Sequence, residues 1–168
     1  ANWLKLAESA LDGLGELGDP AALLDVIPAL DSPHASIRKQ AARALVWVAH
    51  ADGTDALRDA LQHHDPEVKY HAALGLALAG DASVSALVFS EPAAKVISVG
   101  ERIAAALALG ASGEDRLVVF LDDANEKTRS RALLLLMMRE WKASQGTAAR
   151  CLACLSSRTP RFRFIAAR

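Results

Sequence analysis

Small and apolar side chains recur along this chain at an interval of 31 residues. Within each repeat, three of them lie four residues apart, a spacing that places them on one face of an α-helix. The same three columns continue with altered spacing toward the end of the chain. Several columns that share one interval indicate a helical repeat architecture. The columns are Leu6, Ala10 and Leu14; Ile37, Ala41 and Leu45; Val68, Ala72 and Leu76; Val99, Ile103 and Leu107; Thr128, Ala132 and Leu136; and Phe162 and Ala166.

Turn-forming residues divide each repeat into two helices. Asp65-Pro66 is typical of a helix start, and Gly80-Asp81 is typical of a break between helices. Pro28 lies inside an expected second helix and predicts a kink or an early end there. From these signals we expect helix pairs at about 4–17 and 20–30, 34–50 and 54–63, 66–79 and 82–90, 93–110 and 114–122, and 125–142 and 147–156, then an opening helix from about 160.

These elements predict an all-α fold, an α-solenoid (α-α superhelix) of about five stacked helix pairs with a partial sixth. We expect a single repeat domain over residues 1–168, with repeats at about 1–31, 32–63, 64–91, 92–123 and 124–157 and a partial repeat at 158–168. The apolar ends and the missing initiator Met lead us to expect a fragment of a longer protein.

Composition agrees with a helical, soluble chain. The 168 residues include 35 Ala and 25 Leu, both strong helix formers, and only 5% are aromatic. The apolar runs are shorter than a membrane span, and two cysteines make no disulfide framework. We therefore expect a cytoplasmic location without membrane contact. The net charge of −1 divides unevenly, because residues 1–124 carry 9 basic and 18 acidic side chains while residues 125–168 carry 10 and 2.

Two segments, residues 31–45 and 65–76, share a pattern of acidic residue, Pro, two positions, an aliphatic-basic step and a pair of small residues. Ile37-Arg38 and Val68-Lys69 fill the aliphatic-basic step. This pattern resembles the HEAT-like repeats of the phycobilisome-lyase type. The resemblance implies a stacked helical-repeat fold and permits scaffold, lyase and nucleic-acid roles. Val99-Gly100 and Thr128 depart from the pattern in the later repeats.

Reactive residue types give no catalytic assignment. His63, His64 and Asp65 form the densest polar cluster, but their position at a helix end favours a solvated turn over a metal site. Cys151 and Cys154 lie three residues apart, which favours packing on a buried helix face over zinc binding or redox chemistry. We assign no catalytic residue, no cofactor and no metal ligand.

Two features suggest partner binding. Trp47 lies two residues beyond the apolar stripe, so part of its ring is expected at the surface; the alternative that we favour is a filler between repeats. A basic stripe near the end would suit nucleic acid, and here we favour a solvated face or an interface with a following segment. The candidate partner-binding residues are Trp47, Arg129, Arg131, Arg139, Lys142, Arg161 and Arg163.

The sequence therefore predicts a non-catalytic scaffold whose concave face, lined by the second helices, binds another protein or other domains of the parent chain. The first alternative is a nucleic-acid-binding module that uses the basic C-terminal repeats. The second is a HEAT-like lyase or enzyme subunit, which the resemblance permits. Salt-sensitive binding to duplex DNA would distinguish the first alternative.

Overall fold

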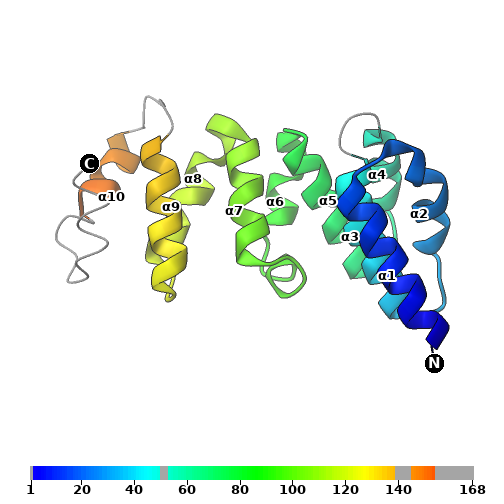
Figure 1. Ribbon diagram of the computed structural model, residues 1–168. Helices are drawn as coiled ribbons and strands as arrows, with labels where there is room; N and C mark the ends of the chain where they lie inside the picture. Colours follow the sequence, from blue (N-terminus) through cyan, green and yellow to red (C-terminus); the bar gives the residue numbers. More distant parts are fainter. Residues whose placement is uncertain (1, 50–52, 139–144, 154–168) are drawn as a thin grey trace. The chain divides into compact units, whose positions relative to one another are not determined.

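The computed structural model describes residues 2–49, 53–138 and 145–153, and every regular element in those ranges is a helix (Figure 1). The chain divides into two compact units, residues 1–98 (unit 1) and residues 99–168 (unit 2). In the described residues, first and second helices alternate along the chain, as the repeat pattern predicts. The predicted all-α helical-repeat class is therefore confirmed, while its organisation as one domain stays a prediction.

Unit 1 contains three helix pairs, and short 3-10 turns precede or follow some of the α-helices. Its elements are α1 (Asn2–Leu17), η1 (Pro20–Ala22), α2 (Leu23–Ala29), α3 (Ala35–Val48), α4 (Thr54–Ala60), α5 (Pro66–Leu78), η2 (Ala82–Val84), α6 (Ser85–Val88) and η3 (Ala93–Lys95).

The Asp65-Pro66 signal starts α5 as predicted, whereas α3 starts only at Ala35, after Asp31 and Pro33. The Asp65 side chain accepts a hydrogen bond of 2.9 Å from the Glu67 backbone N–H, and Pro66 occupies the first turn of α5. There the missing N–H of proline leaves no intrahelical bond unmade. Pro28 lies inside α2, which continues to Ala29, close to the expected end at about residue 30. The early end is therefore not observed, and the kink stays a prediction.

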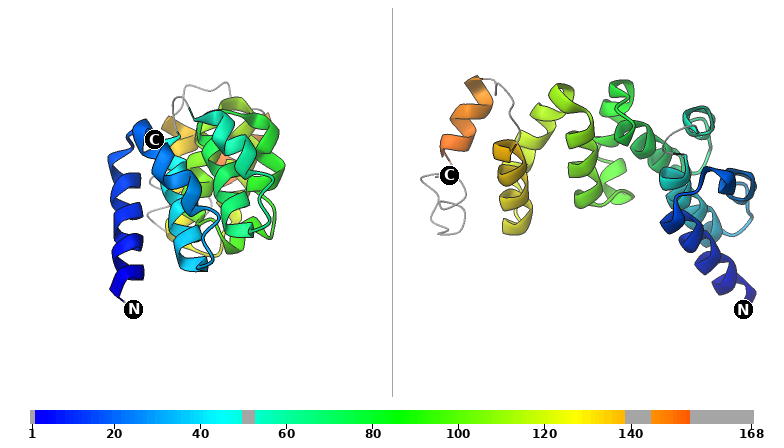
Figure 2. Two further views of the ribbon diagram at one scale, coloured as in Figure 1. Left: turned by 90° about the vertical axis from the view of Figure 1, so that its right-hand side faces the viewer. Right: turned by 45° about the horizontal axis from the view of Figure 1, so that its top comes forward.

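The core of unit 1 lies between neighbouring helix pairs. In Figure 2, α1 and α5 flank α3, while α2 packs against α3 and α4 packs against α5. Ala41 and Ala72 are fully buried, which allows the first helices to approach closely. Helices α1 and α3 approach closely at Gly15, where an added Cβ would lie 3.0 Å from the Ala44 Cα. Each pair therefore completes its core only against the next pair.

Unit 2 follows the same plan with two pairs. Its elements are α7 (Val99–Ala108), η4 (Gly110–Gly113), α8 (Glu114–Val119), η5 (Phe120–Asp122), α9 (Glu126–Met138) and α10 (Gln145–Ala153). Within unit 2, α7 packs against α8 and α9, and α10 packs against α8. Ile103, Leu117 and Leu133 are almost completely buried and form its core.

The prediction of one helix over 93–110 is wrong. The structure has a 3-10 turn at Ala93–Lys95, no helix at 96–98, and α7 only from Val99. Val96 and Ile97 are β-branched, and such residues lose side-chain freedom in a helix. Ile97 is instead buried outside any helix, at 1% exposure. The apolar residues of this segment are therefore explained by burial of Ile97 in the core and not by a helix.

The buried stripe is also wrong in two repeats. Leu6 is 73% exposed and Ala10 is exposed, whereas the buried residues of α1 are Leu11 and Gly15. In α7, Val99 is 38% exposed. The stripe is buried as predicted at Ile37, Ala41 and Leu45 and at Val68, Ala72 and Leu76. A repeated column therefore predicts a helix face but not whether another helix covers it.

The predicted sixth helix and the partial repeat at 158–168 lie outside the described residues, as do the ends of the helices predicted at 125–142 and 147–156. Among the helices that the structure describes, none combines the length and the apolar character needed to cross a membrane.

Candidate functional site

A groove between the second helices α2 and α4 is the main candidate site in unit 1. It has a volume of about 330 Å³. Its apolar walls come from Ile27 and Leu30 on one side and from Ala56 and Ala60 on the other. The short alanine side chains leave room that longer side chains would fill. The groove can therefore receive an apolar side chain from outside the chain.

Exposed apolar side chains continue this groove along α2. Leu24 is 85% exposed and Ile27 is 42% exposed, while Val26 between them is fully buried. Leu24 and Ile27 lie three residues apart in α2, on one helix face. Large exposed apolar groups beside a groove are typical of a contact surface for another protein.

Acidic side chains surround the groove. Asp31 and Asp59 line it directly, and the Asp31 side chain is 81% exposed. Asp25 and Asp55 are also exposed on the two helices. Arg58 on α4 lies 3.5 Å from both Asp55 and Asp81, so its charge is shared between two carboxylates. The second helices of the first two pairs thus present an acidic surface with an apolar centre.

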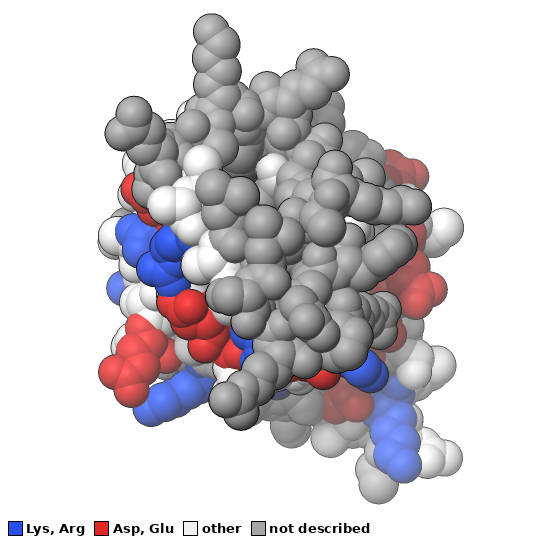
Figure 3. Space-filling model, turned by 90° about the vertical axis from the view of Figure 1, so that its left-hand side faces the viewer, with Lys and Arg blue, Asp and Glu red and all other residues white. Residues whose placement is uncertain are grey.

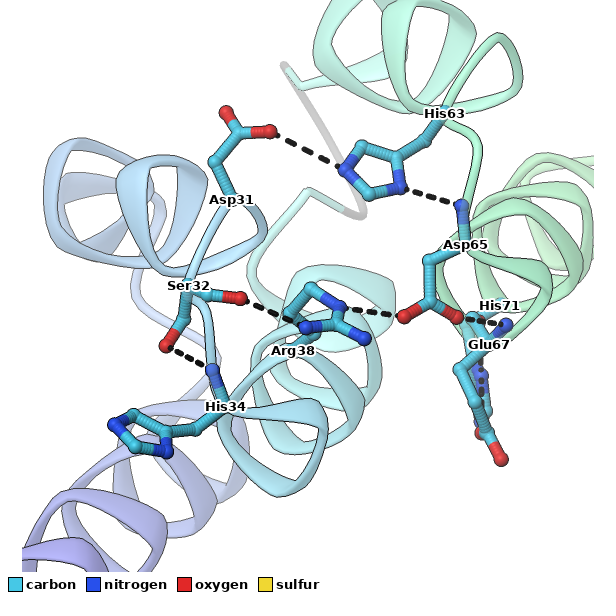
Figure 4. Close-up of polar contacts among 8 residues, drawn as sticks. All are labelled: Asp31, Ser32, His34, Arg38, His63, Asp65, Glu67 and His71. Carbon is cyan, nitrogen blue, oxygen red and sulfur yellow. Dashed lines mark hydrogen bonds and ion pairs between the residues drawn. The ribbon is translucent and has the colours of Figure 1, made fainter.

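A polar network holds the ends of α2 and α4 in position (Figure 4). The Arg38 Nε donates to the Asp65 carboxylate at 2.5 Å, and its Nη1 donates to the Ser32 carbonyl at 2.9 Å. The His63 ring lies between Asp31 and Asp65: its Nδ1 accepts from the Asp65 backbone N–H at 3.0 Å, and its Nε2 is 3.3 Å from the Asp31 carboxylate. This ring therefore donates from Nε2 when it is neutral.

Burial of Asp65 acts to raise the pKa of its carboxyl, but hydrogen bonds from Arg38 and from the Glu67 N–H, with the charge of Arg38, hold that pKa below its usual value of 3.8. The Asp65 side chain is 10% exposed and the Arg38 side chain 19% exposed. The pair is thus an ion pair at neutral pH that joins α3 to the start of α5.

Trp47 lies in a second groove of unit 1, between α1 and α3. The groove has a volume of about 570 Å³, with Gly15, Gly18 and Ala44 along it. The Trp47 side chain is 51% exposed, so its ring is partly at the surface, as the sequence predicts. Three charged side chains also line this groove: Asp12, Glu16 and Arg43.

The structure describes two of the candidate basic residues, Arg129 and Arg131. The Arg129 Nη1 donates to the backbone carbonyls of Asp123 at 2.7 Å and Ala124 at 2.9 Å. Arg131 is exposed on α9, and Arg150 forms an ion pair with Asp122. In the space-filling view of Figure 3, coloured Lys and Arg side chains stand beside Asp and Glu side chains. Arg139, Lys142, Arg161 and Arg163 lie outside the described residues.

Arg38 and Arg129 have the same local role. Each follows the first turn of a first helix, and each donates to the carbonyl of the residue six positions before it, Ser32 or Asp123. Such bonds tie the loop before the helix to the helix itself. The basic step of the repeat pattern is therefore explained by loop structure in these two repeats.

The described His side chains and Cys151 make packing and hydrogen-bond contacts. His63 and His64 stack with their ring centroids 4.3 Å apart, and buried His71 places its Nδ1 2.7 Å from the Glu67 carbonyl oxygen. Among the residues that the structure describes, no group of three or more His, Cys, Asp or Glu side chains is arranged to hold a metal ion. Burial and the nearby Glu114 charge raise the pKa of the Cys151 thiol. Cys154 lies outside the described residues.

The sequence reasoning did not find the α2–α4 groove residues. One signal was available: the run Leu23-Leu24-Asp25-Val26-Ile27 has apolar residues on more than one face of a short helix. A helix of this kind buries one face in the core and leaves the other for a neighbour. The pairing with small Ala56 and Ala60 across the groove depends on tertiary packing.

Comparison with protein families gives one match. The family model for HEAT repeats matches residues 4–77 and, in a second overlapping alignment, residues 24–91. Comparison with curated proteins found no match.

Proposed function

Because the chain belongs to the HEAT repeat family, we propose that it is a non-catalytic scaffold whose second helices bind another protein or another domain of the parent protein. The family is a class of helical repeat generally used for protein interaction. The proposed binding surface comprises α2, α4 and the groove between them.

The exposure of Leu24 and Ile27 beside this groove carries the proposal. A soluble helix normally turns its large apolar residues toward the core, yet 85% of Leu24 lies at the surface. Covering such side chains contributes about 25 cal/mol for each Å² of apolar surface removed from water. A partner that covers Leu24 and fills the groove would gain binding energy from both.

The basic C-terminal repeats offer less support for a nucleic-acid role. Arg129 bonds to backbone carbonyls and Arg150 pairs with Asp122, so both cations already interact within the chain. A phosphate contact would have to compete with these interactions. Binding through Trp47 remains compatible with the proposal, since its groove lies in the same unit.

Site-specific photo-crosslinking tests the proposed surface. A photoreactive residue would replace Leu24 in one variant and Leu17 in a control variant, because Leu17 is 78% exposed but lies on α1. In an extract of the source cells, we expect a defined protein adduct at position 24 that is absent at position 17. The adduct would be identified by mass spectrometry, and its binding repeated with purified partner and with Leu24→Asp.

The proposal predicts that Leu24→Asp weakens binding of the purified partner while the circular dichroism spectrum stays unchanged. Equal adducts at positions 17 and 24, or unchanged binding of Leu24→Asp, would contradict it.

A further inference from the structure

We propose that the groove between α2 and α4 binds a basic amphipathic α-helix of a partner protein. This inference rests on the proposed interaction role and adds the chemistry of the partner. It follows from three properties of the groove: its size, the charge around it, and the fixed positions of the two helices that form it.

The size of the groove suits one or two aliphatic side chains. About 330 Å³ is open between Ile27 on α2 and Leu30 directly after it on one side, and Ala56 and Ala60 on α4 on the other. Ala56 and Ala60 lie four residues apart, so both methyl groups are on the same face of α4. A helix that places an apolar side chain every three or four residues along one face can insert one into the groove and rest the next on Leu24.

The charge around the groove selects a basic partner. Asp31 and Asp59 line opposite sides of the groove, on the α2 side and on α4. Asp59 makes no side-chain ion pair or hydrogen bond within the described structure, so its carboxylate is available to a partner. Lys or Arg residues beside the inserted side chain would approach these carboxylates, whereas Glu or Asp would be repelled.

The positions of the two helices are already set before a partner arrives. The His63 Nε2 lies 3.3 Å from the Asp31 carboxylate, which links the end of α2 to the turn after α4. The Arg38–Asp65 ion pair holds the same two turns from the side of the first helices. A groove whose walls are held in position loses little conformational entropy when a partner binds.

Designed peptides provide the direct test with the full chain. The first peptide is a 14-residue helix of Leu and Lys with its Leu residues on one face. The second has the same composition in an order without an apolar face, and the third carries Glu in place of every Lys. We expect the first peptide to bind, and we expect the other two to bind at least ~10-fold more weakly. Isothermal titration calorimetry measures all three affinities.

Two variants locate the peptide on the protein. Ala56→Leu fills the groove while making the surface more apolar, and we expect it to weaken the first peptide at least ~10-fold. Non-specific hydrophobic adhesion predicts the opposite sign. Asp59→Lys reverses one charge of the groove, and we expect ~3–10-fold weaker binding of the Lys peptide together with tighter binding of the Glu peptide.

Asp12→Lys is the matched control for Asp59→Lys. It makes the same charge change on an exposed residue of α1, away from the α2–α4 groove. We expect the Asp12→Lys protein to bind the Lys peptide within twofold of the unmodified protein, since screening at about 0.1 M salt limits the reach of a surface charge to roughly 10 Å. Circular dichroism spectra and thermal melts confirm that each variant is folded.

Several results would overturn the inference. These are equal binding of the first two peptides, equal binding of the Lys and Glu peptides, undiminished binding to Ala56→Leu, or equal effects of Asp12→Lys and Asp59→Lys. The proposed function fails separately, through absence of the crosslink at position 24. A partner that crosslinks at position 24 but binds Asp59→Lys and Ala56→Leu normally would leave the scaffold role standing and remove this inference.

Discussion

Helices α1 and α3 carry the same repeated stripe in different surroundings. Leu6 in α1 corresponds to Ile37 in α3, and Ala10 corresponds to Ala41. Ile37 is 6% exposed and Ala41 is fully buried, whereas Leu6 is 73% exposed and Ala10 is exposed. The difference shows that a stripe becomes core only where a preceding helix pair covers it.

Helices α1 and α2 both pack against α3 and bury its stripe. Leu6 of α1, at 73% exposure, is left uncovered by the described residues. The contribution of a side chain to stability should therefore depend on its neighbour more than on its place in the repeat. Four pairs of substitutions test this difference, in order of decreasing expected effect.

Truncation of the first stripe residue, Ile37 in α3 or Leu6 in α1, should give the largest difference in stability between the two helices. We expect Ile37→Ala to lower the free energy of unfolding by roughly 3 kcal/mol, because it removes buried surface and leaves a cavity. Leu6→Ala should change it by less than about 0.5 kcal/mol, as surface substitutions usually do. Urea unfolding followed by circular dichroism measures both. Similar losses for the two variants would show that α1 is covered in solution.

Enlargement of the small position is the next test. Ala72 on α5 is fully buried against the preceding pair, and we expect Ala72→Leu to cost about 2 kcal/mol through overpacking. Ala10→Leu adds the same atoms to an exposed position and should leave the melting temperature nearly unchanged. An unchanged melting temperature for Ala72→Leu would contradict the observed register of α3 and α5.

The Arg38–Asp65 ion pair gives a pH-dependent test of the packing between α3 and α5. Asp65→Asn keeps a capping oxygen for α5 but removes the charge that pairs with Arg38, and it should cost on the order of 1.5 kcal/mol at pH 7. Asp31→Asn is the control, because the Asp31 side chain is 81% exposed and lies outside this ion pair.

The pKa of Asp65 is held below its usual value of 3.8, so its ionised form is favoured in the folded state. This stabilisation is present above pH 3.8 and is lost as the pH falls and the folded protein takes up the proton. The difference between the unmodified protein and Asp65→Asn should therefore shrink below about pH 4. A difference that stays constant from pH 7 to pH 3 would contradict the ion pair.

Two glycines of α1 provide the smallest effect. Gly13 has nothing within 4 Å of an added Cβ, so Gly13→Ala should stabilise the protein by roughly 0.5–1 kcal/mol through helix propensity. Gly15 faces α3, where its Cβ would approach the Ala44 Cα at 3.0 Å, so Gly15→Ala should lose that benefit or destabilise the protein. Thermal melts of both variants, measured side by side, give the sign of each change. Equal stabilisation by the two substitutions would contradict the close packing of α1 on α3.

Much of the fold was predictable because its signals are local. Asp65 and Pro66 start α5, and the repeated columns identify the first helices. The break at 96–98 was not predicted, because the apolar periodicity of this segment indicates a helix, whereas Ile97 is buried outside any helix. The exposure of Trp47 was predicted, but the groove of α2 and α4 was not, since it forms between residues about 30 positions apart.

The sequence by itself determined the order of the helices, the repeat interval and the residues that can form a core. These properties depend on local propensity and on the 3.6-residue period of the helix. Only the tertiary structure decided that Ile37 is buried while Leu6 is exposed, and that Ala56 faces Ile27 across an acidic groove. The reason is that a side chain becomes buried only when a second element packs against its helix face. A sequence pattern describes that face but not the element that packs on it.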